Sequence, residues 1–168
     1  MPEVRARQAK PKVAVRKDPF AAWAWMVTLP IALAGLGVAA YLTYVHFHNP
    51  ASLSCPNTGV VNCLKVTTSS QSEIFGHIPV AVTGLAFFFV MTLLMTPWAW
   101  RSTNVWISRL RLAGAVSGVG MVLYLVYVEA VQLKALCLWC TGVHVLTFLL
   151  FLAVLTAYLF RPIDAYTD

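Results

Sequence analysis

The stretch that decides the fold is residues 136–160, LCLWCTGVHVLTFLLFLAVLTAYLF. It contains no Asp, Glu, Lys or Arg, and it is longer than the roughly 20 apolar residues that cross a bilayer as a helix. Two cysteines, Cys137 and Cys140, lie at its beginning. The segment therefore predicts a membrane-spanning helix that starts at a C-x-x-C pair.

Three further apolar segments precede this one. They run over residues 23–44, 79–98 and 112–131, and only the third contains a charged residue, Glu129. The chain is 60% hydrophobic and 11% charged, whereas about a quarter of the residues in a soluble domain are charged. A cleaved signal peptide is the alternative for the first segment, but its apolar stretch exceeds the usual length of about 7–15 residues. We expect an all-α membrane protein, a bundle of four transmembrane helices.

The Lys and Arg residues are distributed unevenly around these segments. Only Lys65 and Lys134 lie on one side of a four-pass arrangement. The others lie on the opposite side: Arg5, Arg7, Lys10, Lys12, Arg16, Lys17, Arg101, Arg109, Arg111 and Arg161. Because positive loops stay in the cytoplasm, we expect both termini there, with residues 47–78 and 132–135 outside. The net charge of +6 is then a topology signal and not a nucleic-acid-binding surface.

The domain organisation follows from this arrangement. Residues 1–19 are rich in charge and proline, which predicts a disordered basic arm near anionic lipid. Residues 20–162 form the membrane domain, and residues 163–168 form a short tail. We expect the arm and the tail to be cytoplasmic in a multi-pass protein of the cell membrane.

All four cysteines map to the outer face. Cys55 and Cys63 enclose seven residues in the outer loop, and Cys137 and Cys140 open the last span. The first cysteine of a C-x-x-C pair at a helix N-terminus is stabilised as a thiolate, which is the species that attacks disulfides. The second lies one turn deeper, open to a ligand inside the bundle. This pattern indicates thiol–disulfide chemistry.

Other interpretations of the cysteines remain open. A zinc site would have to use a loop pair whose seven-residue spacer is longer than usual, and haem attachment needs a histidine where Thr141 stands. Two structural disulfides that brace the loop are a further alternative. The function classes are thus a redox enzyme, a metal- or haem-binding protein and a structural membrane subunit.

Several residues outside the cysteine pairs are candidates for a role. His144 lies one turn after Cys140, where it either binds a ligand or is satisfied inside the bundle. Glu129 is either solvated at the outer end of its span or functional. Lys65 and Lys134 lie near the two cysteine pairs and are candidates for lowering a thiol pKa. Five glycines are expected to allow close helix packing: Gly35, Gly37, Gly114, Gly118 and Gly120.

Together these features resemble the vitamin K epoxide reductase family over Trp23 to Phe160. The motifs that carry the resemblance are the Cys55-x7-Cys63 loop, Ser69, Ile74-Phe75-Gly76 with Pro79, and Leu136-Cys137-Leu138-Trp139-Cys140-Thr141 with His144. The resemblance implies a four-helix bundle around a quinone, capped by an extracytoplasmic loop that bears a short helix.

The resemblance also implies roles for the cysteines. Cys55 would exchange with the thiols of a partner protein, Cys63 would pass electrons to Cys137, and Cys140 would reduce the quinone. Ser69, Ser72, Phe75 and His144 are the implied substrate-binding residues. No metal is implied.

Ser72 and His144 depart from the asparagine and tyrosine of the animal members. This favours the microbial role, in which a secreted or periplasmic thioredoxin-fold protein is reoxidised and menaquinone or ubiquinone accepts the electrons. The alternative is a quinone or vitamin K epoxide reductase that uses a dithiol donor. Because the sequence has no fused thioredoxin-like domain, we expect the partner to be a separate protein.

Overall fold

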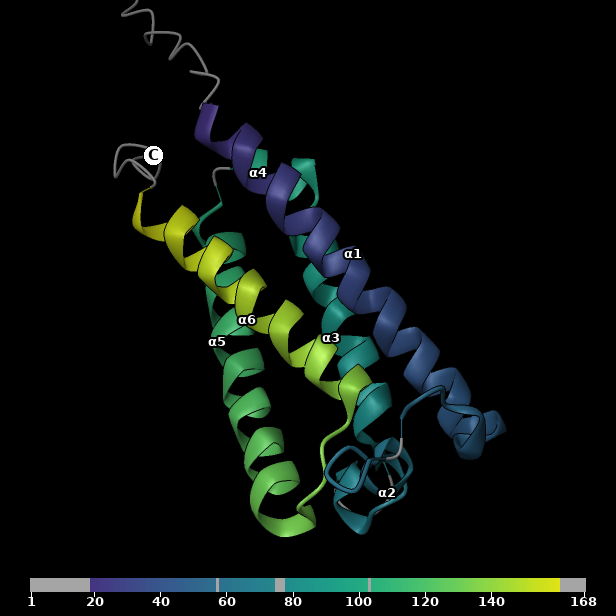
Figure 1. Ribbon diagram of the computed structural model, residues 1–168. Coiled ribbons are helices and arrows are strands. Elements are labelled where there is room, and N and C mark those ends of the chain that lie inside the picture. Colours follow the sequence, from purple (N-terminus) through teal and green to yellow (C-terminus); the bar gives the residue numbers. More distant parts are fainter. Residues whose placement is uncertain (1–18, 57, 75–77, 103, 161–168) are drawn as a thin grey trace, which may run out of the picture.

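The computed structural model describes residues 19–56, 58–74, 78–102 and 104–160 (Figure 1). The expected arm up to Asp18, the tail and Phe75 lie outside these residues. The elements are α1 (Pro19–His48), η1 (Pro50–Ser52), α2 (Cys63–Thr67), η2 (Ser70–Ser72), β1 (Glu73–Ile74), β2 (Ile78–Pro79), α3 (Val80–Leu94), α4 (Pro97–Arg101), α5 (Val105–Tyr127), η3 (Val128–Leu133) and α6 (Leu138–Leu159).

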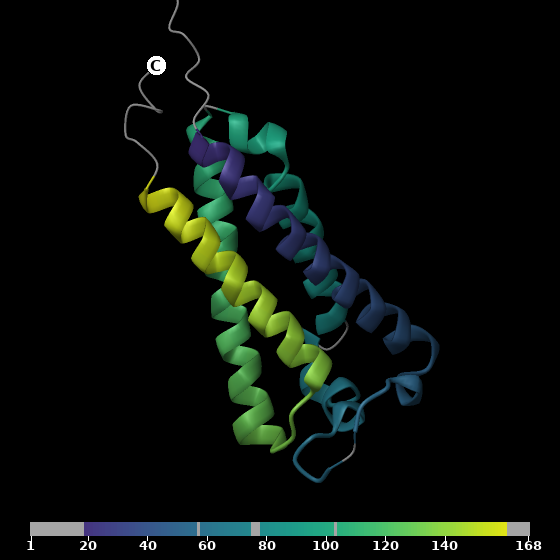
Figure 2. The same cartoon turned by 45° about the horizontal axis from the view of Figure 1, so that its top comes forward.

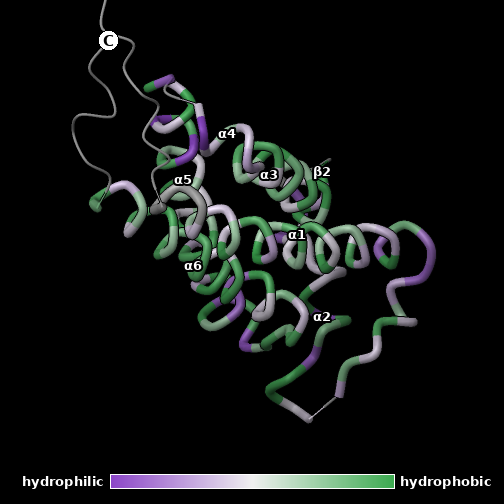
Figure 3. Tube along the Cα trace, turned by 90° about the horizontal axis from the view of Figure 1, so that it is seen from above, coloured by the Kyte–Doolittle hydropathy of each residue, from purple (hydrophilic) through white to green (hydrophobic). Residues whose placement is uncertain are grey.

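Four of these helices form the bundle. α1 packs against α3 and α6, and α5 packs against α6 and α3. The helical segments Trp23–His48, Val105–Leu133 and Leu138–Leu159 are each long and apolar enough to cross a membrane. Large apolar side chains such as Leu33 and Leu123 are exposed on the outside of the bundle, and the helices are predominantly hydrophobic along their length (Figure 3). The predicted all-α, multi-pass membrane fold is confirmed.

The two ends of the bundle differ. The start of α1, the end of α6 and α4 lie at one end, while α2 and η3 lie at the other (Figures 1 and 2). The described residues between Asn49 and Pro79 fold back onto this second end through short helices and a two-stranded antiparallel pairing of β1 with β2. The cysteine-bearing loop therefore covers one mouth of the bundle.

The predicted second span over residues 79–98 is not one continuous helix. α3 ends at Leu94 and has 15 residues, fewer than the roughly 20 that cross a bilayer. Pro97 is the physical reason, because proline disfavours helical backbone in the residue before it. Thr96 accordingly adopts an extended conformation, and its hydroxyl accepts a hydrogen bond from the Ala99 N–H to start α4.

Arg111 compensates for this break. It was expected only as a cytoplasmic topology charge, but its side chain is 2% exposed. Its guanidinium donates to the carbonyl of Leu94 at 3.2 Å and to that of Ala99 at 3.1 Å, and it lies 3.7 Å from the centre of the Trp100 ring. Arg111 thus satisfies carbonyl groups at the interrupted helix end, which apolar surroundings would otherwise leave without a partner.

Close packing of α1 on α3 depends on Gly35. A Cβ at this position would overlap the ring of Phe88, whereas a Cβ at Gly37 would meet nothing within 4 Å among the described residues. Gly114 and Gly118 are also closely packed, but Gly120 has open space like Gly37. The expectation that all five glycines allow close packing was therefore wrong for Gly37 and Gly120.

Gly35→Ala should lower the free energy of unfolding by about 1–3 kcal/mol, the usual cost of overpacking. Gly37→Ala is the matched control on the same helix, and it should not destabilise because alanine favours helix over glycine. Thermal unfolding in detergent measures both. Equal stability of the two variants would contradict the packing described for Gly35 and Phe88.

Candidate functional site

The two cysteine pairs meet at the covered mouth of the bundle. Cys55 and Cys63 form a disulfide, and Cys137 and Cys140 are free thiols. All four belong to one apolar cluster. The structure thus brings together two pairs that are more than seventy residues apart in the chain.

Backbone pairing positions the loop beside the C-x-x-C segment. The Leu136 N–H donates to the Val60 carbonyl at 2.8 Å, and the Asn62 N–H donates to the Leu136 carbonyl at 3.0 Å. Cys63 follows Asn62 and Cys137 follows Leu136, so the pairing sets these cysteines on neighbouring segments. The Asn62 side chain accepts from the Lys65 N–H and caps α2, as asparagine commonly does.

Two side-chain hydrogen bonds join the loop to the neighbouring segments. Lys65 Nζ donates to the carbonyl of Leu133 at 2.7 Å, and Trp139 Nε1 donates to the carbonyl of Ser54 at 3.0 Å. The Trp139 ring also packs against Tyr41 of α1, with the ring centres 4.9 Å apart. The loop is therefore held to η3 and α6 next to the cysteines, and α6 in turn packs on α1.

Cys137 caps the N-terminus of α6. Its Sγ accepts a hydrogen bond from the backbone N–H of Cys140 at 3.3 Å. A hydrogen bond from the Cys140 thiol holds the pKa of Cys137 below its usual value, with help from backbone N–H groups, although burial and the Glu129 charge act in the opposite direction. The expectation of a thiolate-stabilising helix start is consistent with this geometry.

Exposure differs among the cysteines. Cys137 is 0% exposed and Cys63 is 2% exposed, while Cys55 and Cys140 are half-buried. Cys55 is therefore the more accessible residue of the loop disulfide, whereas Cys63 and Cys137 are both buried within the cluster.

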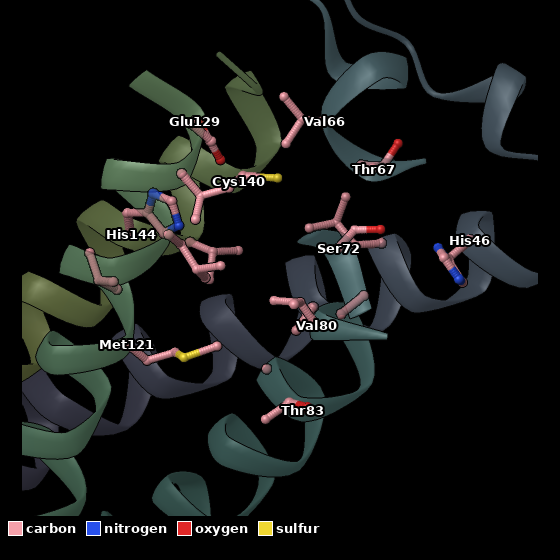
Figure 4. A pocket seen from close by; sticks show the side chains of 18 of the residues that line it. His46, Val66, Thr67, Ser72, Val80, Thr83, Met121, Glu129, Cys140 and His144 are labelled. Atoms are coloured by element: carbon pink, nitrogen blue, oxygen red, sulfur yellow. The ribbon is translucent and has the colours of Figure 1, made fainter. Parts of the chain in front are cut away.

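A cavity of about 360 Å³ lies inside the bundle beneath the loop. Its walls are mostly apolar side chains of α1, α3, α5 and α6. Figure 4 shows Cys140, His144 and Glu129 grouped at one side and Ser72, Thr67 and His46 at the other. An apolar cavity of this size with a few polar groups is typical of a small-molecule site.

The cavity gathers most of the predicted substrate-binding residues. Cys140, His144, Ser69 and Ser72 line it. Ser69 donates from its hydroxyl to the Val66 carbonyl at 2.9 Å, and Ser72 donates to the Ser69 carbonyl at 2.6 Å. The other three cysteines lie in the adjoining cluster. Phe75, the remaining candidate, lies outside the described residues.

Glu129 is a site residue whose role the sequence left open. It is 5% exposed, so it is buried and not exposed at the outer end of its span. Its Oε2 accepts the Cys137 backbone N–H at 3.3 Å, and it lines the cavity with Cys140. Its presence as a charge inside an otherwise apolar span was the signal in the sequence, since such residues often function.

The metal-site interpretation loses support from the disulfide. Its formation removes two of the four thiolates that a shared zinc site would need. Within the part of the chain that the structure describes, no group of three or more His, Cys, Asp or Glu residues is arranged to hold a metal ion. The arrangement instead suits the exchange of electrons between thiols.

Comparison with known proteins agrees with this chemistry. No curated protein matched the chain significantly. The sequence does match the vitamin K epoxide reductase family over residues 18–155, a region that includes all four cysteines. Members of this family are membrane oxidoreductases that work through cysteines and in general use quinones. The chain belongs to the vitamin K epoxide reductase family.

Proposed function

We propose that this membrane oxidoreductase passes electrons from a secreted or periplasmic thioredoxin-fold protein to a membrane quinone and thereby supports disulfide bond formation. Electrons would enter at Cys55/Cys63 and leave from Cys137/Cys140. The observation that carries the proposal is the position of Cys140, which belongs to the cluster of both cysteine pairs and also lines the cavity.

The first half of the cycle is disulfide exchange. A thiolate of the partner attacks Cys55 and releases the Cys63 thiolate, and the second thiol of the partner then frees Cys55. Cys63 attacks Cys137 in an oxidised Cys137–Cys140 pair and releases Cys140. Attack of Cys55 on Cys63 restores the loop disulfide and leaves the second pair reduced. This end state has the same pairing as the structure.

The second half is oxidation of the Cys137/Cys140 dithiol. Closing this disulfide releases two electrons and two protons, and a quinone that takes up both becomes a hydroquinone. Menaquinone and ubiquinone both have the ring chemistry for this step. The apolar cavity suits the ring, and Ser72 and His144 are proposed to contact its oxygens, with Ser69 and Phe75 contributing to the same site.

The membrane arrangement is part of the proposal. We infer that α3 and the segment through α4 together make a fourth crossing, since Arg111 satisfies carbonyls where the helix is interrupted. Residues 20–162 would form the membrane domain, with residues 1–19 and 163–168 in the cytoplasm. The distribution of Lys and Arg supports cytoplasmic termini and extracytoplasmic cysteines.

A turnover assay with purified protein tests this function. Reduced thioredoxin-fold protein is the donor, and a soluble quinone or vitamin K epoxide is the acceptor. We expect quinone reduction coupled to donor oxidation, with a higher kcat/KM for the quinone than for the epoxide. A preference for the epoxide would instead support a vitamin K epoxide reductase, and absence of quinone reduction would contradict the proposal.

His144→Leu is the variant that tests the binding site within the same assay. Loss of one hydrogen bond to the quinone should raise its KM about tenfold, while the KM for the donor stays unchanged. His48→Leu is the matched control, because His48 is exposed at the end of α1 and is not among the residues that line the cavity.

A further inference from the structure

Glu129 occupies an unusual place for a carboxyl group. It lies in η3, a single turn of π-helix that extends α5. Such turns often occur at functional sites, because they change the direction in which side chains point. Here the side chain turns inward to the cavity, toward Cys140 (Figure 4). Burying a carboxyl group in apolar surroundings is costly, so a purely structural need would be met more cheaply by a neutral acceptor.

Glu129 lies beside the Cys137–Cys140 pair. Its Oε2 accepts the backbone N–H of Cys137 at 3.3 Å, which sets the carboxyl beside the residue that caps α6. It shares the cavity wall with Cys140 and His144. The carboxyl is therefore adjacent to the dithiol and also open to the volume in which a substrate would bind.

The chemistry of the second half-reaction needs a proton carrier at this place. Cys140 lines the cavity and its thiol donates a hydrogen bond to Cys137, so the Cys140 proton is released inside the site. When Cys137 and Cys140 close their disulfide, two protons must leave the sulfurs while the quinone gains two. Other groups that titrate or carry charge near Glu129 are His144 on α6, Lys134 after η3, Lys65 on α2 and His46 across the cavity. Among these, Glu129 accepts the hydrogen bond from the Cys137 backbone N–H and lines the cavity with Cys140.

We propose that Glu129 carries a proton from the Cys140 thiol to the quinone as the Cys137–Cys140 disulfide forms. The carboxylate takes the proton of the Cys140 thiol when the Cys137 sulfur bonds to the Cys140 sulfur, and the two electrons pass to the quinone. The carboxyl then gives its proton to a quinone oxygen and returns to the carboxylate form. The Cys137 proton leaves when that thiol ionises, and the quinone takes up its second proton from water. This inference rests on the proposed function, with the quinone as the oxidant.

Glu129→Gln separates proton transfer from positioning. The amide oxygen still accepts the Cys137 N–H, but the side chain no longer carries a proton. We expect the kcat for quinone reduction to fall by about 10²–10⁴-fold, the range for loss of a general acid–base group. The KM for the quinone should stay the same. Glu73→Gln is the matched control at an exposed site, and it should behave as the wild-type protein does.

Two readouts do not depend on turnover with quinone. Equilibrium quinone binding and the rate at which a dithiol donor reduces Cys137–Cys140 in the absence of quinone should both be unchanged in Glu129→Gln.

Chemical rescue is a separate test. In Glu129→Ala, added formate should restore quinone reduction, because a small acid can occupy the vacated space. A merely structural carboxyl would not give such rescue.

The outcomes distinguish the inference from the function on which it rests. If the wild-type protein does not reduce quinone, the proposed function fails. If the wild-type protein does so and Glu129→Gln matches its kcat, only the proton-transfer role is overturned. A further result would also overturn the proton-transfer role: Glu129→Ala is slow, formate does not restore its quinone reduction, and Glu129→Gln is fully active. Glu129 would then have a positioning role alone.

Discussion

Replacement of Cys140 by serine should abolish quinone reduction. Cys140 belongs to the cysteine cluster and also lines the cavity, so the account makes it the sulfur through which electrons leave the protein. Serine preserves the size and polarity of the side chain but cannot form a disulfide. Stopped-flow absorbance of a soluble quinone, with reduced donor protein in excess, measures the effect as a complete loss of enzyme-dependent reduction.

The same variant should still exchange disulfides at the loop. Cys55 and Cys63 retain their own disulfide, so a stoichiometric amount of donor should be oxidised before the reaction stops. Thr141→Ser is the matched control on the first turn of α6, since Thr141 is exposed and its hydroxyl donates only to the Cys137 carbonyl. Continued quinone turnover in Cys140→Ser would show that electrons leave by another route.

The sequence predicts best those helices whose formation depends on residues close together in the chain. The apolar segment of residues 136–160 and its C-x-x-C start predicted α6 closely, because helix formation in lipid depends on a run of uncharged residues. The second span was predicted less well. Pro97 signals a break, but the buried position of Arg111 over Trp100 depends on contacts between separate helices, which composition does not encode.

In the site, too, the features set by neighbouring residues were predicted, and those set by contacts between distant segments were not. Four cysteines and their spacing predict redox chemistry and the helix N-cap at Cys137. They do not predict the pairing of Val60 and Asn62 with Leu136, since the segments are far apart in the chain and the strand-like contact is very short. Glu129 was a candidate because of its charge, but the π-helical turn that points it into the cavity has no signature in the residues themselves.

We expect a defined number of hydroquinones per chain when the fully reduced protein reacts with quinone. The chain has four cysteines, and each disulfide that forms releases two electrons. Two disulfides should therefore yield two hydroquinones per chain. In the Cys55→Ser/Cys63→Ser double variant, only the inner dithiol remains, and the yield should be one.

The most direct test of the relay is the same measurement on Cys137→Ser/Cys140→Ser. Reduced protein is mixed with excess soluble quinone under anaerobic conditions, and hydroquinone and remaining thiols are counted together. We expect Cys55 and Cys63 to stay reduced and no hydroquinone to form, because the loop pair transfers electrons to the quinone only through the inner pair. Formation of one hydroquinone per chain in this variant would contradict the relay.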